Sequence, residues 1–119
     1  MESIYEKFIK HDVPIKAVST STQTTSLAKS LGIEILDFNA VKDLAVVIDG
    51  ADEVDPNKNL IKGGGGALLM EKLVANFSKD LIIIVDQTKL VSSLGNFPLP
   101  IEIVKFGSEK TKGHIYTLL

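Results

Sequence analysis

The chain has 119 residues, 45% of them hydrophobic, and a formal net charge of −2. This length and composition suit one globular domain with a core, and the weak negative charge gives no electrostatic basis for binding nucleic acid. Cysteine is absent, which excludes disulfides and cysteine-based zinc sites. No apolar run approaches a transmembrane length, and the charged N-terminus does not resemble a signal peptide, so we expect a cytoplasmic protein and no membrane partner.

The first part of the chain is predicted to alternate short helices and strands. Residues 3–10 show the apolar spacing of an amphipathic helix, and residues 15–18 and 33–36 read as strands on either side of a helix that ends at Leu31. Thr22 or a neighbour is expected to cap that helix, and Gly32 fits the position just after it. The hydroxyl run 19–22 has two open interpretations, a helix cap or a set of ligand contacts.

The next stretch begins with five apolar residues, Leu44–Ile48, without alternation, which is typical of a strand buried on both faces. It ends abruptly at Asp49-Gly50-Ala51-Asp52-Glu53. Open α/β sheets bind ligands beyond the carboxyl ends of their strands, so these carboxylates are candidate ligand contacts. The following loop fails the pattern of a calcium-binding EF-hand, because Leu60 and Gly66 replace the required glycine and glutamate. Asp49-Gly50-Ala51-Asp52 could hold magnesium, but acidic loops are mostly solvated or capping, so we predict no metal site.

Lys62 and four glycines, 63–66, precede a predicted helix over residues 67–77. Glycine permits close backbone approach, and unsatisfied N–H groups at a helix start form an anion site, to which Lys62 would add a positive charge. The run does not fit a P-loop, since Ala67 and Leu68 follow it, nor a dinucleotide-binding motif, since Leu68 and Leu69 occupy the places that a third glycine would need. All 13 basic residues are lysine, so a phosphate would be held without arginine. A small, oxygen-rich anionic ligand would suit this stretch.

Glu71 lies on a shoulder of the predicted helix. At 100° per residue, the expected core stripe consists of Leu69, Met70, Leu73, Val74 and Phe77. The Glu71 side carries Leu68 and two alanines rather than polar residues, which indicates that something covers it. From the residues alone, a surface glutamate stabilised by the helix dipole is an open alternative.

The remaining elements continue the alternation of strands and helices. Residues 81–85 read as a second fully buried strand, with Lys89 near its end either in solvent or facing a ligand. A helical turn is predicted at 91–94, a short strand at 101–104 and the start of a helix, cut short, within 106–119. We predict an α/β fold with a Rossmann-like parallel sheet and helices on both faces, as a single but incomplete domain over 1–119.

Several of these motifs, in order, resemble A-type ribose-5-phosphate isomerases. The matching pieces include Asp49-Gly50-Ala51-Asp52-Glu53, Lys62 with the glycines and Ala67, Glu71-Lys72, Asp86 with Lys89, and Phe97-Pro98-Leu99-Pro100. The resemblance covers roughly residues 14 to 106. It implies interconversion of ribose 5-phosphate and ribulose 5-phosphate through an enediolate, in the non-oxidative branch of the pentose phosphate pathway.

The resemblance also implies roles for individual residues. Glu71 would be the catalytic base, and Asp49 and Lys62 would complete the catalytic set. Substrate contacts would come from Asp49, Gly50, Ala51, Asp52, Lys62, Gly63, Gly64, Gly65 and Lys89. No cofactor is required, and the protein is expected to be a homo-oligomer, as a dimer. The alternatives are a non-catalytic sugar-phosphate binding or interaction module and an inactive truncated isomerase.

The sequence departs from the family pattern at both ends. The family's N-terminal phosphate-binding loop and its second, smaller domain have no counterpart here, so we expect a central portion of the isomerase. We expect this chain alone to be essentially inactive and to self-associate through uncovered apolar surface.

Overall fold

The computed structural model describes residues 2–118, so the two ends of the predicted domain, residues 1 and 119, lie outside it. The chain forms two compact units. The first unit comprises Met1–Gly50 and Leu69–Ile84, and the second comprises Ala51–Leu68 and Val85–Leu119. The prediction of a single incomplete domain over the whole chain stays a prediction, and each unit is described by itself.

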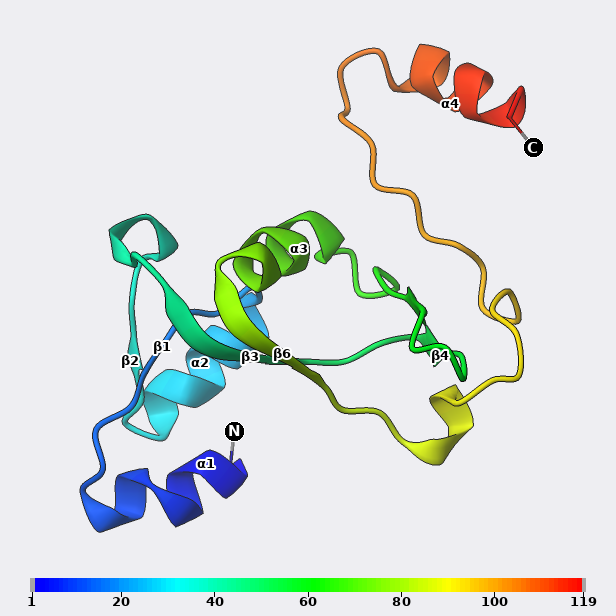
Figure 1. Cartoon of the computed structure of the whole chain (residues 1–119). Coiled ribbons are helices and arrows are strands. Elements are labelled where there is room, and N and C mark those ends of the chain that lie inside the picture. Colours follow the sequence, from blue (N-terminus) through cyan, green and yellow to red (C-terminus); the bar gives the residue numbers. More distant parts are fainter. Residues whose placement is uncertain (1, 119) are drawn as a thin grey trace. The chain divides into compact units, whose positions relative to one another are not determined.

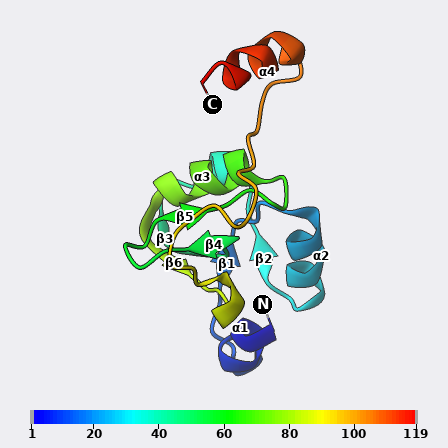
Figure 2. The ribbon, with the colours of Figure 1, turned by 90° about the vertical axis from the view of Figure 1, so that its right-hand side faces the viewer.

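The first unit begins with small elements around one parallel strand pair (Figures 1 and 2). Strands β1 (Lys16–Ala17) and β2 (Glu34–Ile35) pair in parallel, and their side chains Lys16 and Glu34, which are opposite in register, form an ion pair of 3.4 Å. Between them runs α2 (Thr22–Ser30), whose Ala28 is fully buried, and Ile33 just after α2 is almost as buried. The helices of this part are α1 (Glu2–Lys7), η1 (Ile9–His11), α2 (Thr22–Ser30) and η2 (Phe38–Ala40).

Helix α2 begins and ends where its residue types predict. The Ser21 hydroxyl accepts the Thr24 N–H at 3.1 Å, which satisfies one of the donors left over at a helix start. Gly32 follows the C-cap with a φ of +73°, and its N–H donates to the Lys29 carbonyl. The predicted cap is confirmed at Ser21, and the position of Gly32 is confirmed.

A longer parallel pair forms the rest of the first unit. Strand β3 (Leu44–Asp49) lies beside β6 (Ser78–Ile83) in parallel register, from Leu44 opposite Ser78 to Asp49 opposite Ile83. The connection between them contains α3 (Leu68–Asn76), which lies over one side of the pair in Figure 1. Phe38 and Phe77 meet edge to face with ring centroids 5.4 Å apart.

Burial of this pair on both faces was predicted, and that prediction is wrong. Val46 and Ile48 of β3, and Leu81 and Ile82 of β6, are each exposed by 44–53%. Among the described residues β3 and β6 pair only with each other, and a two-stranded ribbon has too few neighbours to cover both of its faces. The predicted core stripe of α3 is wrong for the same reason, since within it Val74 is buried but the other four side chains are exposed: Leu69, Met70, Leu73 and Phe77.

The second unit contains a hairpin that the sequence analysis treated as a loop. Strands β4 (Glu53–Val54) and β5 (Leu60–Ile61) pair antiparallel (Figure 2). Their turn is closed by the Asp55 carboxylate, which accepts the backbone N–H of Asn59 at 2.8 Å and its side-chain amide at 2.9 Å. These bonds hold the pKa of Asp55 below its usual range, and the bond from the Asn59 side chain contributes most. Each strand is only two residues long, which is too short for an alternating pattern to be recognised.

The rest of the second unit has less strand and helix than predicted. Residues 91–94 form no helical turn and residues 92–94 are bends; the helical turn lies earlier, at η3 (Gln87–Lys89). Residues 101–104 form no strand, because no described strand lies beside them to pair with. The predicted C-terminal helix is confirmed as α4 (Ser108–Tyr116).

The mixed α/β class with parallel strands is confirmed. The strands within residues 2–118 form three two-stranded sheets, β1-β2, β3-β6 and β4-β5, rather than one continuous sheet. None of the helices in the described part of the chain is both long enough and apolar enough to span a bilayer.

Candidate functional site

The predicted site residues are divided between the two units. The first unit contains Asp49, Gly50 and Glu71, and the second contains Ala51, Asp52, Lys62, Gly63, Gly64, Gly65 and Lys89.

Asp49 is the last residue of β3, where the sequence predicts a ligand-facing carboxylate. Its Oδ1 accepts the N–H of Gly50 at 2.8 Å, and its backbone carbonyl accepts the N–H of Ile84 at 2.8 Å. The residue is half-buried. The end of β3 is therefore fixed by Ile84, the residue after β6, and the Asp49 carboxylate is oriented by the N–H of Gly50.

Glu71 lies in the first turn of α3 and is half-buried. Ala75 and Ser78 on the same shoulder are also half-buried, whereas Leu69 and Leu73 on the predicted core stripe are exposed. The prediction that the Glu71 side of the helix is covered is confirmed. A partly desolvated carboxylate interacts more strongly with a nearby dipole or charge than one in bulk water, which suits a proton-transfer group.

In the second unit the structure brings Asp52 and the glycine loop together. The Asp52 N–H donates to the carbonyl of Ile61 at 2.7 Å, which fixes its backbone against β5. Its Oδ2 accepts the Gly64 N–H at 2.8 Å. The Gly64 amide thus has an acceptor within the chain, where the sequence predicted that it would face a ligand.

The glycine loop is a tight turn that follows β5 and Lys62. The Gly66 N–H donates to the Gly63 carbonyl at 2.9 Å, and these glycines have φ values of +75° and +102°, a region that other residues avoid. A Cβ on Gly64 would lie 2.7 Å from Asp52 Oδ1 and 2.9 Å from Phe97 Cζ, so a side chain at this position would force Asp52 or Phe97 to move.

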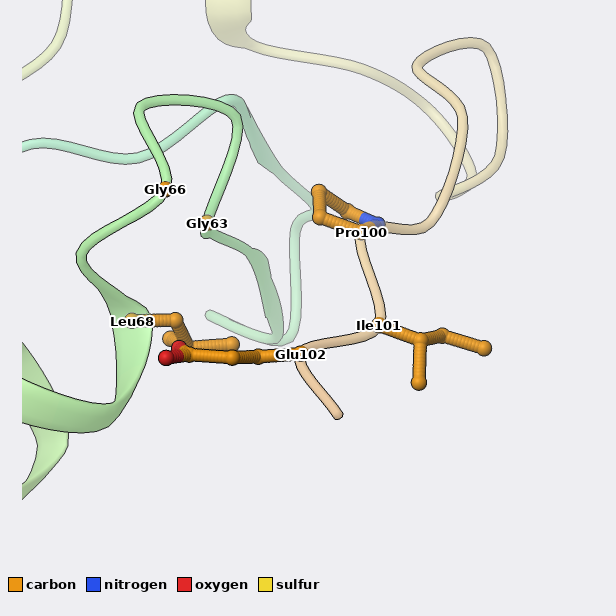
Figure 3. A pocket seen from close by; sticks show the side chains of 6 residues that line it. All are labelled: Gly63, Gly66, Leu68, Pro100, Ile101 and Glu102. Atoms are coloured by element: carbon orange, nitrogen blue, oxygen red, sulfur yellow. The ribbon is translucent and has the colours of Figure 1, made fainter. Parts of the chain in front are cut away.

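A cavity of about 150 Å³ adjoins this turn, lined by Gly63, Gly66, Leu68, Pro100, Ile101 and Glu102. Figure 3 shows Glu102 pointing toward Leu68 beside the turn, and Ile101 pointing the other way. Apolar side chains and one carboxylate do not suit a phosphate group, because like charges repel. This cavity was not predicted from the sequence, because residues 101–104 were expected to form a strand.

Lys89 is the last residue of η3 and is half-buried. Just before it, the Asp86 carboxylate caps the turn, accepting the Thr88 N–H at 2.8 Å and the Thr88 hydroxyl. The Thr88 bonds, with a smaller contribution from the positive charge of Lys89, hold the pKa of Asp86 below its usual range. Lys89 is therefore held by a short, locally capped turn.

Glu53 was among the carboxylates predicted as candidate ligand contacts, and the structure gives its carboxylate backbone partners within the chain. It is 3% exposed, and its two carboxylate oxygens accept the N–H groups of Gly95 and Phe97. No local pattern marks it, because its partners lie more than forty positions away in the sequence.

Comparison with known proteins gives a consistent result. The family model described as ribose 5-phosphate isomerase A (phosphoriboisomerase A) matches residues 16–119. A ribose-5-phosphate isomerase A of Bacillus mycoides is 52% identical over 110 residues, which are 92% of this chain and 50% of the relative. A ribose-5-phosphate isomerase A 1 of Oceanobacillus iheyensis is 44% identical over 99% of this chain and 53% of its own length.

Solved structures agree with the sequence relatives. A ribose 5-phosphate isomerase of Methanocaldococcus jannaschii superposes with a TM-score of 0.90 at 26% identity, over 98% of this chain and 52% of that one. A D-ribose-5-phosphate isomerase in complex with phospho-erythronic acid has a TM-score of 0.89 at 37% identity, with the same coverage.

The fold and the matches therefore define an α/β protein related to sugar-phosphate isomerases. The chain belongs to the ribose 5-phosphate isomerase A family. It spans about half the length of the curated relatives it matches.

Proposed function

We propose that this chain carries the proton-transfer part of a ribose-5-phosphate isomerase. The observation that carries the proposal is the family match over residues 16–119, because it includes Asp49, Lys62, Glu71 and Lys89. The substrate pair is ribose 5-phosphate and ribulose 5-phosphate. We place the protein in the cytoplasm, where a pathway enzyme of sugar phosphates would meet its substrate.

The proposed chemistry uses Glu71 as a single base. Its carboxylate takes the proton from C2 of the open-chain aldose, the C–H electron pair becomes the C1–C2 double bond, and the carbonyl electrons move to O1. The same carboxyl group returns the proton to C1, while the O2 proton is lost and O1 gains one, so C2 becomes the carbonyl carbon. The half-buried position of Glu71 supports this role.

The other residues are proposed to bind and to stabilise charge. Lys62 would stabilise the negative charge that develops on the enediolate oxygens. Asp49 and Asp52 would accept hydrogen bonds from sugar hydroxyls, and one of them would assist ring opening or proton movement between O1 and O2. Lys89 would contact the sugar phosphate. The remaining proposed contacts are backbone groups of Gly50, Ala51, Gly63, Gly64 and Gly65, with Gly64 acting through the Asp52 carboxylate that it binds.

A homo-oligomeric state, as a dimer, is also proposed. The exposed aliphatic side chains of β3, β6 and α3 support it, because burying them in an interface would remove apolar surface from water.

A second candidate function is a non-catalytic sugar-phosphate binding module. The observation that favours it is that this chain matches only about half of each relative, so about half of the relative lies outside the matched segment. The two functions differ in what they require of Glu71, because a binder has no need of a base.

A chimera tests the proposal directly. Residues 16–119 would replace the matching segment of the Bacillus mycoides relative, and ribulose 5-phosphate formation would be measured. We expect turnover within about tenfold of the parent enzyme, which corresponds to about 1.4 kcal/mol of activation free energy. A folded chimera that binds phospho-erythronic acid but has no activity would support the binding module instead.

A further inference from the structure

Glu53 is a buried charged side chain in the second unit, 3% exposed. A carboxylate is rarely buried unless strong donors compensate the lost hydration. Its Oε2 accepts the Gly95 N–H at 2.8 Å and its Oε1 accepts the Phe97 N–H at 2.6 Å. Within residues 2–118 no lysine or histidine forms an ion pair with it, so backbone dipoles stabilise the charge.

The two bonds join segments that are distant in sequence. Glu53 begins β4 and lies opposite Ile61 in the hairpin. The segment that it holds, 94–100, has no helix or strand of its own. The Glu53 carboxylate links that segment to the hairpin, next to the bridge between Val54 and Leu90 and the bond from the Val91 N–H to the Val54 carbonyl.

The held segment contacts the glycine loop. The Phe97 ring edge lies 2.9 Å from where a Gly64 Cβ would be, and Pro100 lies 3.3 Å from the corresponding point on Gly63. The Gly64 Cβ position also lies 2.7 Å from Asp52 Oδ1, and the Asp52 carboxylate accepts the Gly64 N–H. The Phe97 ring and the Asp52 carboxylate therefore both lie close beside Gly64.

We infer that Glu53 is a positioning residue for the sugar-phosphate site, acting through Phe97 on Gly64 and Asp52. Its carboxylate sets the backbone of Phe97, the Phe97 ring closes one side of Gly64, and Gly64 in turn orients Asp52. The ligand-binding half of this inference rests on the proposed function, whereas the mechanical half requires no ligand.

Amide hydrogen exchange by NMR on the full 119-residue chain tests the mechanical half. In Glu53→Gln the new NH₂ group faces a backbone N–H, so exchange at Gly95 or Phe97 should rise at least tenfold, and exchange at Gly64 should rise with it. The matched control is Glu109→Gln, an exposed glutamate in α4, which should change none of the three amides. If the Gly95 and Phe97 amides exchange faster while the Gly64 amide keeps its protection, Glu53 holds only the backbone of Gly95 and Phe97, and the inference is overturned.

Phe97→Leu tests the inference even if Glu53→Gln does not fold. It keeps the Phe97 N–H and removes the ring edge, so Gly64 exchange should rise severalfold while Gly95 stays protected. Unchanged exchange at Gly64 in this variant would overturn the inference.

Titration with phospho-erythronic acid tests the ligand half. We expect both variants to bind about tenfold more weakly at a temperature where their unfolding curves show them fully folded, and Glu53→Asp to recover part of the loss. If folded variants with a mobile Gly64 bind as tightly as the parent, the positioning role is overturned. If the parent chain does not bind phospho-erythronic acid, the proposed function fails, and the exchange results still decide the mechanical half.

Discussion

The Gly64 N–H donates to Asp52 Oδ2 at 2.8 Å, and a methyl group on Gly64 would lie only 2.7 Å from Asp52 Oδ1. The carboxylate thus lies so close to the glycine backbone that a side chain on Gly64 would displace it. This contact lies within the loop that the sequence predicts to be an anion site. It shows that the Asp52 carboxylate already accepts one of the backbone N–H groups of that loop.

Gly64→Ala should therefore destabilise the chain, by about 1–3 kcal/mol, because the added methyl forces Asp52 or Phe97 to move. Gly65→Ala is the matched control, since a Cβ there meets nothing within 4 Å, and should change the free energy of unfolding by less than about 0.5 kcal/mol. Urea unfolding of both variants measures the difference. Equal stability of the two would contradict the close approach at Gly64.

Thr88→Val should raise the pKa of Asp86 toward the ordinary aspartate value of about 3.9, because the Thr88 hydroxyl is the largest cause of its depression. A depressed folded-state pKa contributes stability above the unfolded value that is lost as the pH falls through the folded one. The variant should therefore lose less stability than the parent on acidification below about pH 4.

A ¹³C NMR titration of the Asp86 carboxyl measures this pKa. Thr111→Val is the control, because the Thr111 hydroxyl donates to the Gly107 carbonyl in α4 and not to Asp86. An Asp86 pKa that is the same in the parent and Thr88→Val would show that the hydroxyl bond is unimportant.

Lys89→Ala should weaken binding of phospho-erythronic acid more at low salt than at high salt, because salt screens exposed charges. Lys110→Ala, in exposed α4, serves as the charge-matched control and should have little effect at either salt concentration. Isothermal titration at two ionic strengths gives the comparison. The same loss of affinity at both would mean that Lys89 acts through packing rather than charge.

The 119-residue chain by itself should form ribulose 5-phosphate orders of magnitude more slowly than a full-length relative. It spans about half of such a relative, and contacts to remote parts of a substrate contribute to its orientation. Its exposed apolar side chains on β3, β6 and α3 should also make it associate. Turnover assays run beside sedimentation measure both. A well-behaved monomer with relative-like turnover would contradict this prediction.

Local chemistry explains which features were predictable. The Ser21 cap, Gly32 and α4 depend on neighbouring residues, and all were placed correctly. That the Glu71 side of the helix is covered was predicted from two alanines at helical spacing.

The features that were missed depend on distant partners. The burial of Glu53 requires amides more than forty residues away, and the exposure of Ile48 depends on how many strands lie beside β3. A pattern of side chains along one segment carries no information about either.

The central claim is that Glu71 transfers the proton between C2 and C1, and isotope exchange tests it most directly. The measurement is exchange of the C2 proton of ribose 5-phosphate with D₂O, by NMR, on the chimera carrying residues 16–119 and on its Glu71→Gln variant, with Glu109→Gln as the matched control. The account predicts that Glu71→Gln still binds phospho-erythronic acid within a fewfold but exchanges at least about 10³-fold more slowly, since the one base is gone. Exchange near the parent rate in Glu71→Gln would contradict it.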